Sequence, residues 1–190
     1  MGDKKRHEVI LGGTGGQGVI TIGYILAEAA ARSYQYVTRF PIYMATMRGG
    51  PAYCTVIFSD QEIAAPILSR FDNAVAMESG AYSRFKPGLK PGGNFLVNSS
   101  IVKKLDENPS FRTFPVPVTD LAQETGMPAM ANLIMLGAYQ GVTHALAEEL
   151  IQGAIQKVMA PEGDGNEEKI KKMFSAYQRG LAYAREQKWS

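Results

Sequence analysis

The chain has 190 residues, of which 45% are hydrophobic and 20% are charged, and its formal net charge is +2 at pH 7. This composition is typical of a globular protein with one sizeable core. A net charge this small gives no basis for binding nucleic acid or an anionic membrane by bulk attraction. The single cysteine, Cys54, excludes an internal disulfide framework and a cysteine-built zinc or iron–sulfur site within the chain.

The N-terminal residues 1–7 are polar and lack the apolar core of a signal peptide. The chain also lacks the run of about eighteen apolar residues that a membrane-spanning helix needs. We therefore expect a cytoplasmic protein without a membrane segment.

Strands that alternate with helices are predicted in the first half of the chain. Residues 8–12 form an apolar run typical of a buried strand, and residues 19–30 carry apolar side chains at the three- and four-residue spacing of a helix. Further strands are predicted at residues 34–40, 52–59, 73–77, 94–98 and 113–118, with helical turns at 81–85. Prolines in the last of these strands favour the edge of a sheet.

From residue 130 onward the pattern becomes helical. Helices are predicted at residues 131–146, 148–159 and about 165–188. The chain is thus predicted to be α/β: a single Rossmann-like three-layer domain of residues 1–190, with a mostly parallel sheet and a helical C-terminal part. The last helix is expected to pack on this domain or on a partner.

A glycine-rich loop connects the first strand to the first helix. Its candidate ligand-binding residues are Gly13, Thr14, Gly15, Gly16, Gln17 and Gly18. Glycines allow a tight turn and a close approach of a ligand to the backbone. The N-terminus of the following helix adds unpaired N–H groups and a positive dipole end. The loop is therefore a candidate phosphate-binding site.

Besides binding a phosphate group in general, this loop has two more specific candidate ligand classes and a third, purely structural interpretation. The loop matches G-x-G-x-x-G, but residues 33–40 contain no acidic residue for the ribose of NAD, although Arg39 could face the 2′-phosphate of NADP. Val19 stands where a Walker A loop needs lysine, which excludes that class. In the third interpretation the glycines only permit close packing of strand and helix.

A second loop carries Arg48 ahead of Gly49 and Gly50, and we expect it at the same sheet edge as the glycine loop. Arg48 could bind a phosphate or a partner's carboxylate, or form an ordinary surface ion pair. His7 and His144 have no acidic or serine partner at a readable spacing, and we see no paired carboxylates or cluster of metal ligands. We predict no catalytic residue and no metal ligand, and so one part of a larger enzyme.

An ordered set of motifs resembles the gamma subunit of the 2-oxoacid:acceptor (ferredoxin) oxidoreductases. The set consists of Gly-Thr-Gly-Gly-Gln-Gly-Val at residues 13–19, Arg48-Gly49-Gly50, Ser59-Asp60 with Ile63 and Pro66, Asp72 before an apolar strand, and Asn132 ahead of Leu136-Gly137-Ala138. The resemblance covers residues 8–160 and is far more specific than any one of its motifs.

The resemblance implies a subunit of an enzyme that decarboxylates a 2-oxoacid and forms an acyl-coenzyme A. It implies alpha and beta subunits that bind thiamine diphosphate with magnesium, and a ferredoxin-like subunit and iron–sulfur clusters outside this chain. For this chain it implies a role in assembly and in holding coenzyme A, with Asn132 as a candidate polar contact to the ligand. A free-standing NAD(P)-binding oxidoreductase and a purely structural subunit are the alternatives.

One segment departs from the family pattern. The family shows Tyr-Gly-Pro-Glu ahead of its Arg-Gly-Gly, whereas this chain has Tyr43-Met44-Ala45-Thr46. The loss of a glutamate and the more apolar character lead to the hypothesis that the associated substrate is an aryl-2-oxoacid.

Overall fold

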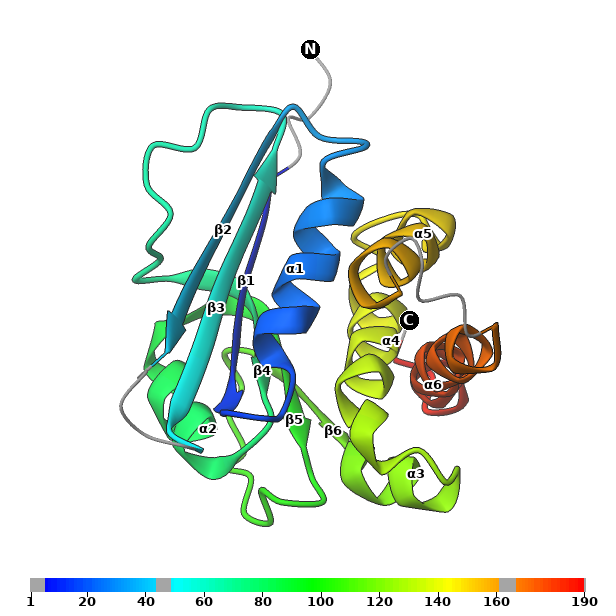
Figure 1. The fold of residues 1–190 in the computed structure, drawn as a ribbon. Helices are drawn as coiled ribbons and strands as arrows, with labels where there is room; N and C mark the ends of the chain where they lie inside the picture. The colour runs from blue at the N-terminus through cyan, green and yellow to red at the C-terminus, as the bar shows by residue number, and fades with distance from the viewer. Residues whose placement is uncertain (1–5, 44–48, 161–166, 190) are drawn as a thin grey trace.

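The fold is built on a six-stranded sheet with the strand order β2-β3-β1-β4-β5-β6 (Figure 1). The structure, a computed structural model, describes residues 6–43, 49–160 and 167–189. The strands are β1 (Arg6–Thr14), β2 (Tyr36–Tyr43), β3 (Pro51–Ser59), β4 (Phe71–Ala76), β5 (Leu89–Asn98) and β6 (Arg112–Val116). The proline-containing β6 lies at an edge, as predicted.

Helices cover both faces of the sheet unequally, which confirms the three-layer α/β prediction (Figure 1). The helices are α1 (Val19–Ala30), α2 (Ser79–Phe85), α3 (Val118–Glu124), α4 (Ala131–Thr143), α5 (Glu148–Met159) and α6 (Glu167–Glu186), with short 3₁₀ turns η1 (Lys86–Gly88) and η2 (Pro128–Met130). The large core joins α1 and α3–α6 to one face, and a smaller core joins α2 to the other.

The sheet is less parallel at one side than the alternating pattern predicts. β1, β4, β5 and β6 pair in parallel, whereas β3 runs antiparallel to both β1 and β2. The cause is the short connection between Tyr43 and Pro51, because a parallel pair needs a crossover of about a dozen residues or more. β2 and β3 therefore form a hairpin, and the carboxyl end of β2 still lies at the same edge as that of β1.

The helical C-terminal part is held by a close crossing of α4 and α6. A Cβ added to Gly137 of α4 would lie 2.0 Å from the carbonyl oxygen of Tyr177, and one added to Gly180 of α6 would lie 1.8 Å from that of Ile134. The two helix backbones are thus in direct contact, which only glycine permits at these positions.

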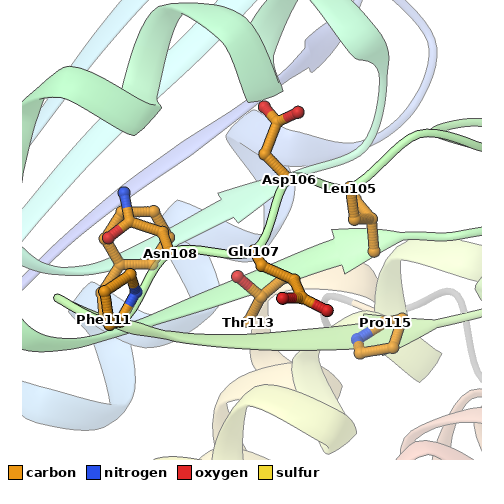
Figure 2. Close-up of a pocket in the computed structure, with 8 residues that line it drawn as sticks. Leu105, Asp106, Glu107, Asn108, Phe111, Thr113 and Pro115 are labelled. Carbon is orange, nitrogen blue, oxygen red and sulfur yellow. The ribbon is translucent and has the colours of Figure 1, made fainter.

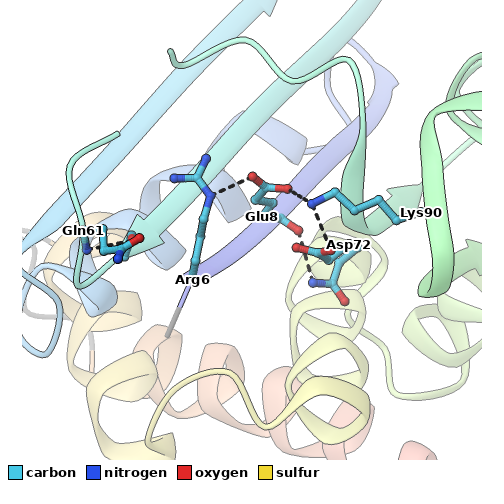
Figure 3. Close-up of polar contacts among 7 residues, drawn as sticks. Arg6, Glu8, Gln61, Asp72 and Lys90 are labelled. Atoms are coloured by element: carbon cyan, nitrogen blue, oxygen red, sulfur yellow. Dashed lines mark hydrogen bonds and ion pairs between the residues drawn. The ribbon is translucent and has the colours of Figure 1, made fainter. Parts of the chain in front are cut away.

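A polar cluster lies toward the amino ends of the strands, on the face that carries α2 (Figure 3). The buried carboxylate of Glu8 accepts hydrogen bonds from Arg6 Nε at 2.8 Å and from Lys90 Nζ at 2.6 Å. Lys90 Nζ also forms an ion pair with Asp72 at 3.1 Å. Asn73 Nδ2 donates to the carbonyl of Glu8 at 3.1 Å. Burial alone would raise the pKa of Glu8, but the hydrogen bonds from Lys90 and Arg6 outweigh it, so its pKa lies below the ordinary value.

Candidate functional site

The candidate site lies where β1, β4 and β5 end at the carboxyl edge of the sheet. In the sheet, β1 lies between β3 of the β2–β3 hairpin and β4, and along the chain it is followed by α1 and then β2. Ligands of open α/β sheets bind outside the carboxyl ends of strands at such a change in strand order. The carbonyl of Met77, just after β4, accepts Gln17 Nε2 at 3.5 Å and Asn98 Nδ2 at 3.3 Å. These contacts join the ends of the three strands around one point.

The glycine loop is a closed turn fixed by its own glutamine. Gln17 N–H donates to the carbonyl of Thr14 at 3.1 Å, and Thr14 N–H donates to Gln17 Oε1 at 2.8 Å. Gly15 N–H donates to the carbonyl of Gly50 at 2.8 Å, which joins this loop to the one after β2. The sequence predicted that the two loops meet at one edge, and this contact confirms it.

The candidate glycines differ in burial, in backbone conformation and in the space around them. Gly13 is buried, and a Cβ there would lie 2.5 Å from Gln17 Oε1, so it serves packing. Gly15 and Gly16 are exposed; Gly16 has φ +96, and a Cβ added to it would meet no atom within 4 Å. Gly18 begins α1 in the left-handed region at φ +72. Packing explains Gly13, whereas the positive φ in the turn from Thr14 to Gln17 explains the glycine at position 16.

The N-terminus of α1 has no side-chain cap. Gly18 is its N-cap, no side chain caps it, and its first turn contains no acidic residue. The first intrahelical bond runs from Ile22 N–H to the Gly18 carbonyl at 3.0 Å, so the amides before Ile22 precede the helical ladder. Such an end attracts negative charge through its N–H groups and the helix dipole.

Asn132 stands beside this helix end. It belongs to the first turn of α4, which also lacks a side-chain cap, and it is 6% exposed. A Cβ on Gly18 would lie 2.4 Å from Asn132 Nδ2. Asn132 Oδ1 is buried without a hydrogen-bond partner among the described residues. An unpaired buried acceptor costs about 1–3 kcal/mol of stability. A ligand or partner that donates a hydrogen bond to Asn132 Oδ1 would remove this cost.

A cavity of about 220 Å³ joins these features. Its lining is Gly16, Gln17, Met77, Ile101, Thr119, Pro128, Ala129, Ala131 and Asn132. Sequence reasoning identified Gly16, Gln17 and Asn132 but missed Met77, Ile101 and Thr119. The signal was available, because Met77 ends the predicted strand 73–77, Ile101 lies three residues after the predicted strand 94–98, and Thr119 follows the predicted strand 113–118. The carboxyl ends of parallel strands share one edge.

Arg48 lies outside the described residues, so its predicted role stays a prediction. Gly50, two residues further along the chain, is described, and its carbonyl accepts the hydrogen bond from Gly15 N–H. His144, expected within a helix, instead ends α4 in the left-handed conformation at φ 47.

Arg39 and Cys54 do not join the site. Arg39 lies over the ring of Tyr24 at 4.9 Å, and it stands level with Val9 through the shared partner Val56. Thr14 lies five residues further along β1, about 17 Å away at about 3.3 Å per residue. Arg39 therefore does not line the cavity at the glycine loop, and its suggested contact to NADP stays a prediction. Cys54 is fully buried, and burial raises the pKa of its thiol to about 11.

A second, wider groove of about 630 Å³ lies away from the glycine loop (Figure 2). It is lined by residues 105–109 with Phe111, Thr113 and Pro115, along the edge strand β6. Asp106 in this groove pairs with Lys86. Its lining contains none of the sequence-predicted site residues.

The described ranges hold neither a metal cluster nor a membrane-spanning helix. Residues 6–43, 49–160 and 167–189 contain no group of three or more His, Cys, Asp or Glu side chains placed to share a metal ion. Within the same ranges, no helix has the length and apolar character needed to cross a membrane.

The fold is α/β, with a glycine-rich turn at the carboxyl edge of the sheet. A family described as pyruvate ferredoxin/flavodoxin oxidoreductase matches residues 8–183, and the chain belongs to this family. Its resemblance to the gamma subunits of 2-oxoacid:ferredoxin oxidoreductases is confirmed, and such a subunit is part of an enzyme complex and not catalytic alone.

This chain matches one relative over nearly its whole length and another over only part of it. The 2-oxoglutarate synthase subunit KorC of Methanocaldococcus jannaschii is 33% identical over 96% of this chain and 96% of its own length. The ketoisovalerate oxidoreductase subunit VorA of Methanothermobacter thermautotrophicus is 30% identical over 94% of this chain, but only 36% of its own length is matched.

Two solved structures share the fold. The keto/oxoacid ferredoxin oxidoreductase gamma subunit of Geobacter sulfurreducens has a TM-score of 0.76 at 28% identity, covering 94% of this chain and 98% of its own. The 2-oxoglutarate:ferredoxin oxidoreductase of Magnetococcus marinus, solved with 2-oxoglutarate, coenzyme A and succinyl-CoA bound, has a TM-score of 0.86 at 26% identity. The present chain covers 32% of that longer chain and is itself covered to 96%.

Proposed function

We propose that this subunit holds part of coenzyme A at the glycine loop of a 2-oxoacid:ferredoxin oxidoreductase and helps to assemble that complex. The observation that carries the proposal is the uncapped start of α1, with the exposed Gly16 beside it and the buried, unpartnered oxygen of Asn132 across the cavity. The Magnetococcus marinus relative, with coenzyme A bound, supports the same ligand.

The residues present fit one part of coenzyme A rather than all of it. Pockets that enclose a drug-sized ligand measure about 300–1,000 Å³, and the cavity here measures about 220 Å³. The amides at the start of α1 suit the phosphate oxygens, whereas Met77, Ile101 and Pro128 provide apolar contact. The remainder of the ligand then lies against a neighbouring subunit.

The bond-making groups belong to those neighbours in this proposal. We assign thiamine diphosphate with its magnesium to alpha and beta subunits, and the iron–sulfur clusters to partner chains that include a ferredoxin-like subunit. A single cysteine cannot ligate such a cluster, and Cys54 is buried in the core.

Kinetics of the intact complex test the coenzyme A contact. Gly16→Ala adds a methyl group in open space at a positive φ, and Gly15→Ala adds one at ordinary contact distance, 3.4 Å from Gly49 N. We expect both to raise the KM for coenzyme A about tenfold or more while the KM for the 2-oxoacid is unchanged. Gly92→Ala, in β5 at φ +78 with nothing within 4 Å of the added Cβ, is the matched control. An unchanged KM for coenzyme A in both loop variants would leave a purely structural subunit.

We propose an aryl-2-oxoacid as the substrate class, because residues 43–46 are more apolar than the Tyr-Gly-Pro-Glu of the family pattern and lack its glutamate. Only Tyr43 of this segment is described, and it is 65% exposed at the end of β2. Turnover of the purified complex on aryl, branched and dicarboxylic 2-oxoacids tests it. Preference for 2-oxoglutarate, the substrate in the name of the KorC relatives, would contradict it.

A further inference from the structure

Two polar side chains of the cavity at the glycine loop have complementary hydrogen-bonding groups. Thr119 and Asn132 both line this cavity, and apolar side chains such as Met77 and Ile101 form other parts of its wall. The described residues that line it are all uncharged. Apart from the backbone amides at the start of α1, this lining therefore offers nothing that attracts an anion, and it favours an uncharged group.

Asn98 fixes the direction of the Thr119 hydroxyl. Asn98 is fully buried, and its Nδ2 lies 3.3 Å from the carbonyl oxygen of Met77 and 3.0 Å from Thr119 Oγ1. The orientation of this amide is certain from its partners, because the Met77 carbonyl can only accept and Ser100 N–H, 3.2 Å from Asn98 Oδ1, can only donate. Thr119 Oγ1 therefore accepts from Asn98, and its own hydrogen is left to donate elsewhere.

The hydroxyl hydrogen of Thr119 and the amide oxygen of Asn132 both lack a protein partner within the described residues. Thr119 is half-buried in the first turn of α3, and its hydroxyl donates to no described acceptor. Asn132 Oδ1 is buried and receives no described donor. A ligand group that satisfies both must accept one hydrogen bond, donate another and carry no charge.

We propose that Thr119 and Asn132 together bind a secondary amide of the ligand, with the Thr119 hydroxyl donating to the amide carbonyl and Asn132 Oδ1 accepting from the amide N–H. Aliphatic carbon beside the amide then lies against Met77, Ile101 and Pro128. For the identity of the ligand this inference rests on the proposed function. Coenzyme A carries secondary amides only in its pantetheine arm, so this arm enters the cavity and the adenosine half stays outside.

The charges of coenzyme A agree with this direction of binding. Its adenosine half carries a 3′-phosphate, which would be placed in an uncharged cavity beside the buried oxygen of Asn132 and be repelled by it. The diphosphate, which joins the adenosine half to the pantetheine arm, suits the amides that begin α1. The amino edge of adenine also presents a donor and an acceptor, so the test must separate the two halves.

Binding of each half of coenzyme A to the intact complex tests the inference. Calorimetry measures the affinity of 4′-phosphopantetheine, which contains the amides, and of 3′,5′-adenosine bisphosphate, which contains the adenine. Thr119→Val removes the hydroxyl and keeps the shape of the side chain. We expect it to weaken binding of 4′-phosphopantetheine about five- to tenfold, as the loss of one hydrogen bond does, and to leave 3′,5′-adenosine bisphosphate unchanged. Asn132→Leu should have the same effect.

Thr113→Val is the matched control, because Thr113 is a half-buried threonine of β6 that lines the separate groove at the sheet edge. We expect it to leave both affinities unchanged. Weaker binding of 3′,5′-adenosine bisphosphate by Thr119→Val, with 4′-phosphopantetheine unaffected, would place adenine in the cavity and overturn the inference. Unchanged affinities for both halves would overturn it as well.

Gly16→Ala separates a failure of this inference from a failure of the proposed function. If Gly16→Ala weakens binding of coenzyme A whereas Thr119→Val and Asn132→Leu do not, the glycine loop binds the ligand and only the amide contact is wrong. If none of the three variants changes the affinity for coenzyme A, the proposed function fails together with the inference.

Discussion

The backbone of Gly18 and the side chain of Asn132 are in close contact at the candidate site. A Cβ on Gly18 would lie 2.4 Å from Nδ2 and 2.8 Å from Cγ of Asn132. The contact joins the N-cap of α1 to the first turn of α4. Gly16 and Gln17, just ahead of α1, line one cavity together with Asn132. Position 18 is therefore restricted both by its left-handed backbone and by its neighbour.

Replacing Gly18 separates these two restrictions. We expect Gly18→Ala to lower the free energy of unfolding by about 2–4 kcal/mol, because left-handed strain adds to the clash with Asn132. Gly16→Ala carries strain without a clash and should cost only about 1–2 kcal/mol. Chemical denaturation of the purified subunit measures both. Equal losses in the two variants would show that Asn132 moves aside freely.

Asn132→Leu should change stability and ligand binding in opposite directions. The substitution removes a buried acceptor without a partner, so we expect the subunit to gain about 1 kcal/mol of unfolding free energy or to stay unchanged. In the complex, the KM for coenzyme A should rise, since a polar contact is lost. A large loss of stability would mean that Asn132 already has a partner, and an unchanged KM would remove it from the site.

The crossing of α4 and α6 predicts a strong effect of a single methyl group. Gly137→Ala and Gly180→Ala place a Cβ within 2.0 Å of backbone carbonyl oxygens, so we expect each to cost about 3 kcal/mol or more. Gly153→Ala, in α5 with open space around it, should instead stabilise by about 0.5–1 kcal/mol. Thermal unfolding of the three variants gives the comparison, and a mild effect at both crossing positions would argue against this helix packing.

The Glu8 cluster predicts a dependence of stability on pH. Because the pKa of Glu8 is lowered in the folded chain, its contribution is present above the unfolded value of about 4.3 and is lost as the pH falls through the lower folded value. Glu8→Gln should therefore cost about 1–2 kcal/mol at pH 7, since Lys90 retains Asp72.

The difference between wild type and Glu8→Gln should shrink below about pH 4, where the wild-type carboxylate becomes protonated. Urea denaturation at pH 7, 5 and 3 measures it. A difference that is constant over this range would show that the ion pairs of Glu8 do not stabilise the fold.

Local sequence patterns were sufficient to predict the strands, the helices and the three-layer α/β class. The apolar run before Gly13 and the helical spacing after Gly18 correspond to β1 and α1, and the prolines near the end of the sheet correspond to the edge strand β6. The antiparallel direction of β3 was missed, because apolar content gives the position of a strand but not its direction. Only the length of the connection after Tyr43 carried that information.

The site could be predicted by its residues but not by their separate roles. The glycine pattern predicted the loop, and the family resemblance implied Asn132 as a further contact; the structure places Gly16, Gln17 and Asn132 around one cavity. It could not show that Gly13 serves packing while Gly16 faces open space, since this depends on which side chains come opposite in the fold. Nor could it show the unpartnered oxygen of Asn132, which is a property of tertiary packing.

The location of coenzyme A in the intact complex tests the central claim most directly. An electron cryo-microscopy structure of the complex with coenzyme A should place a phosphate oxygen within about 3 Å of the backbone nitrogens at the start of α1, next to Gly16. Coenzyme A bound elsewhere, with the glycine loop sealed by side chains of a partner subunit, would contradict the account.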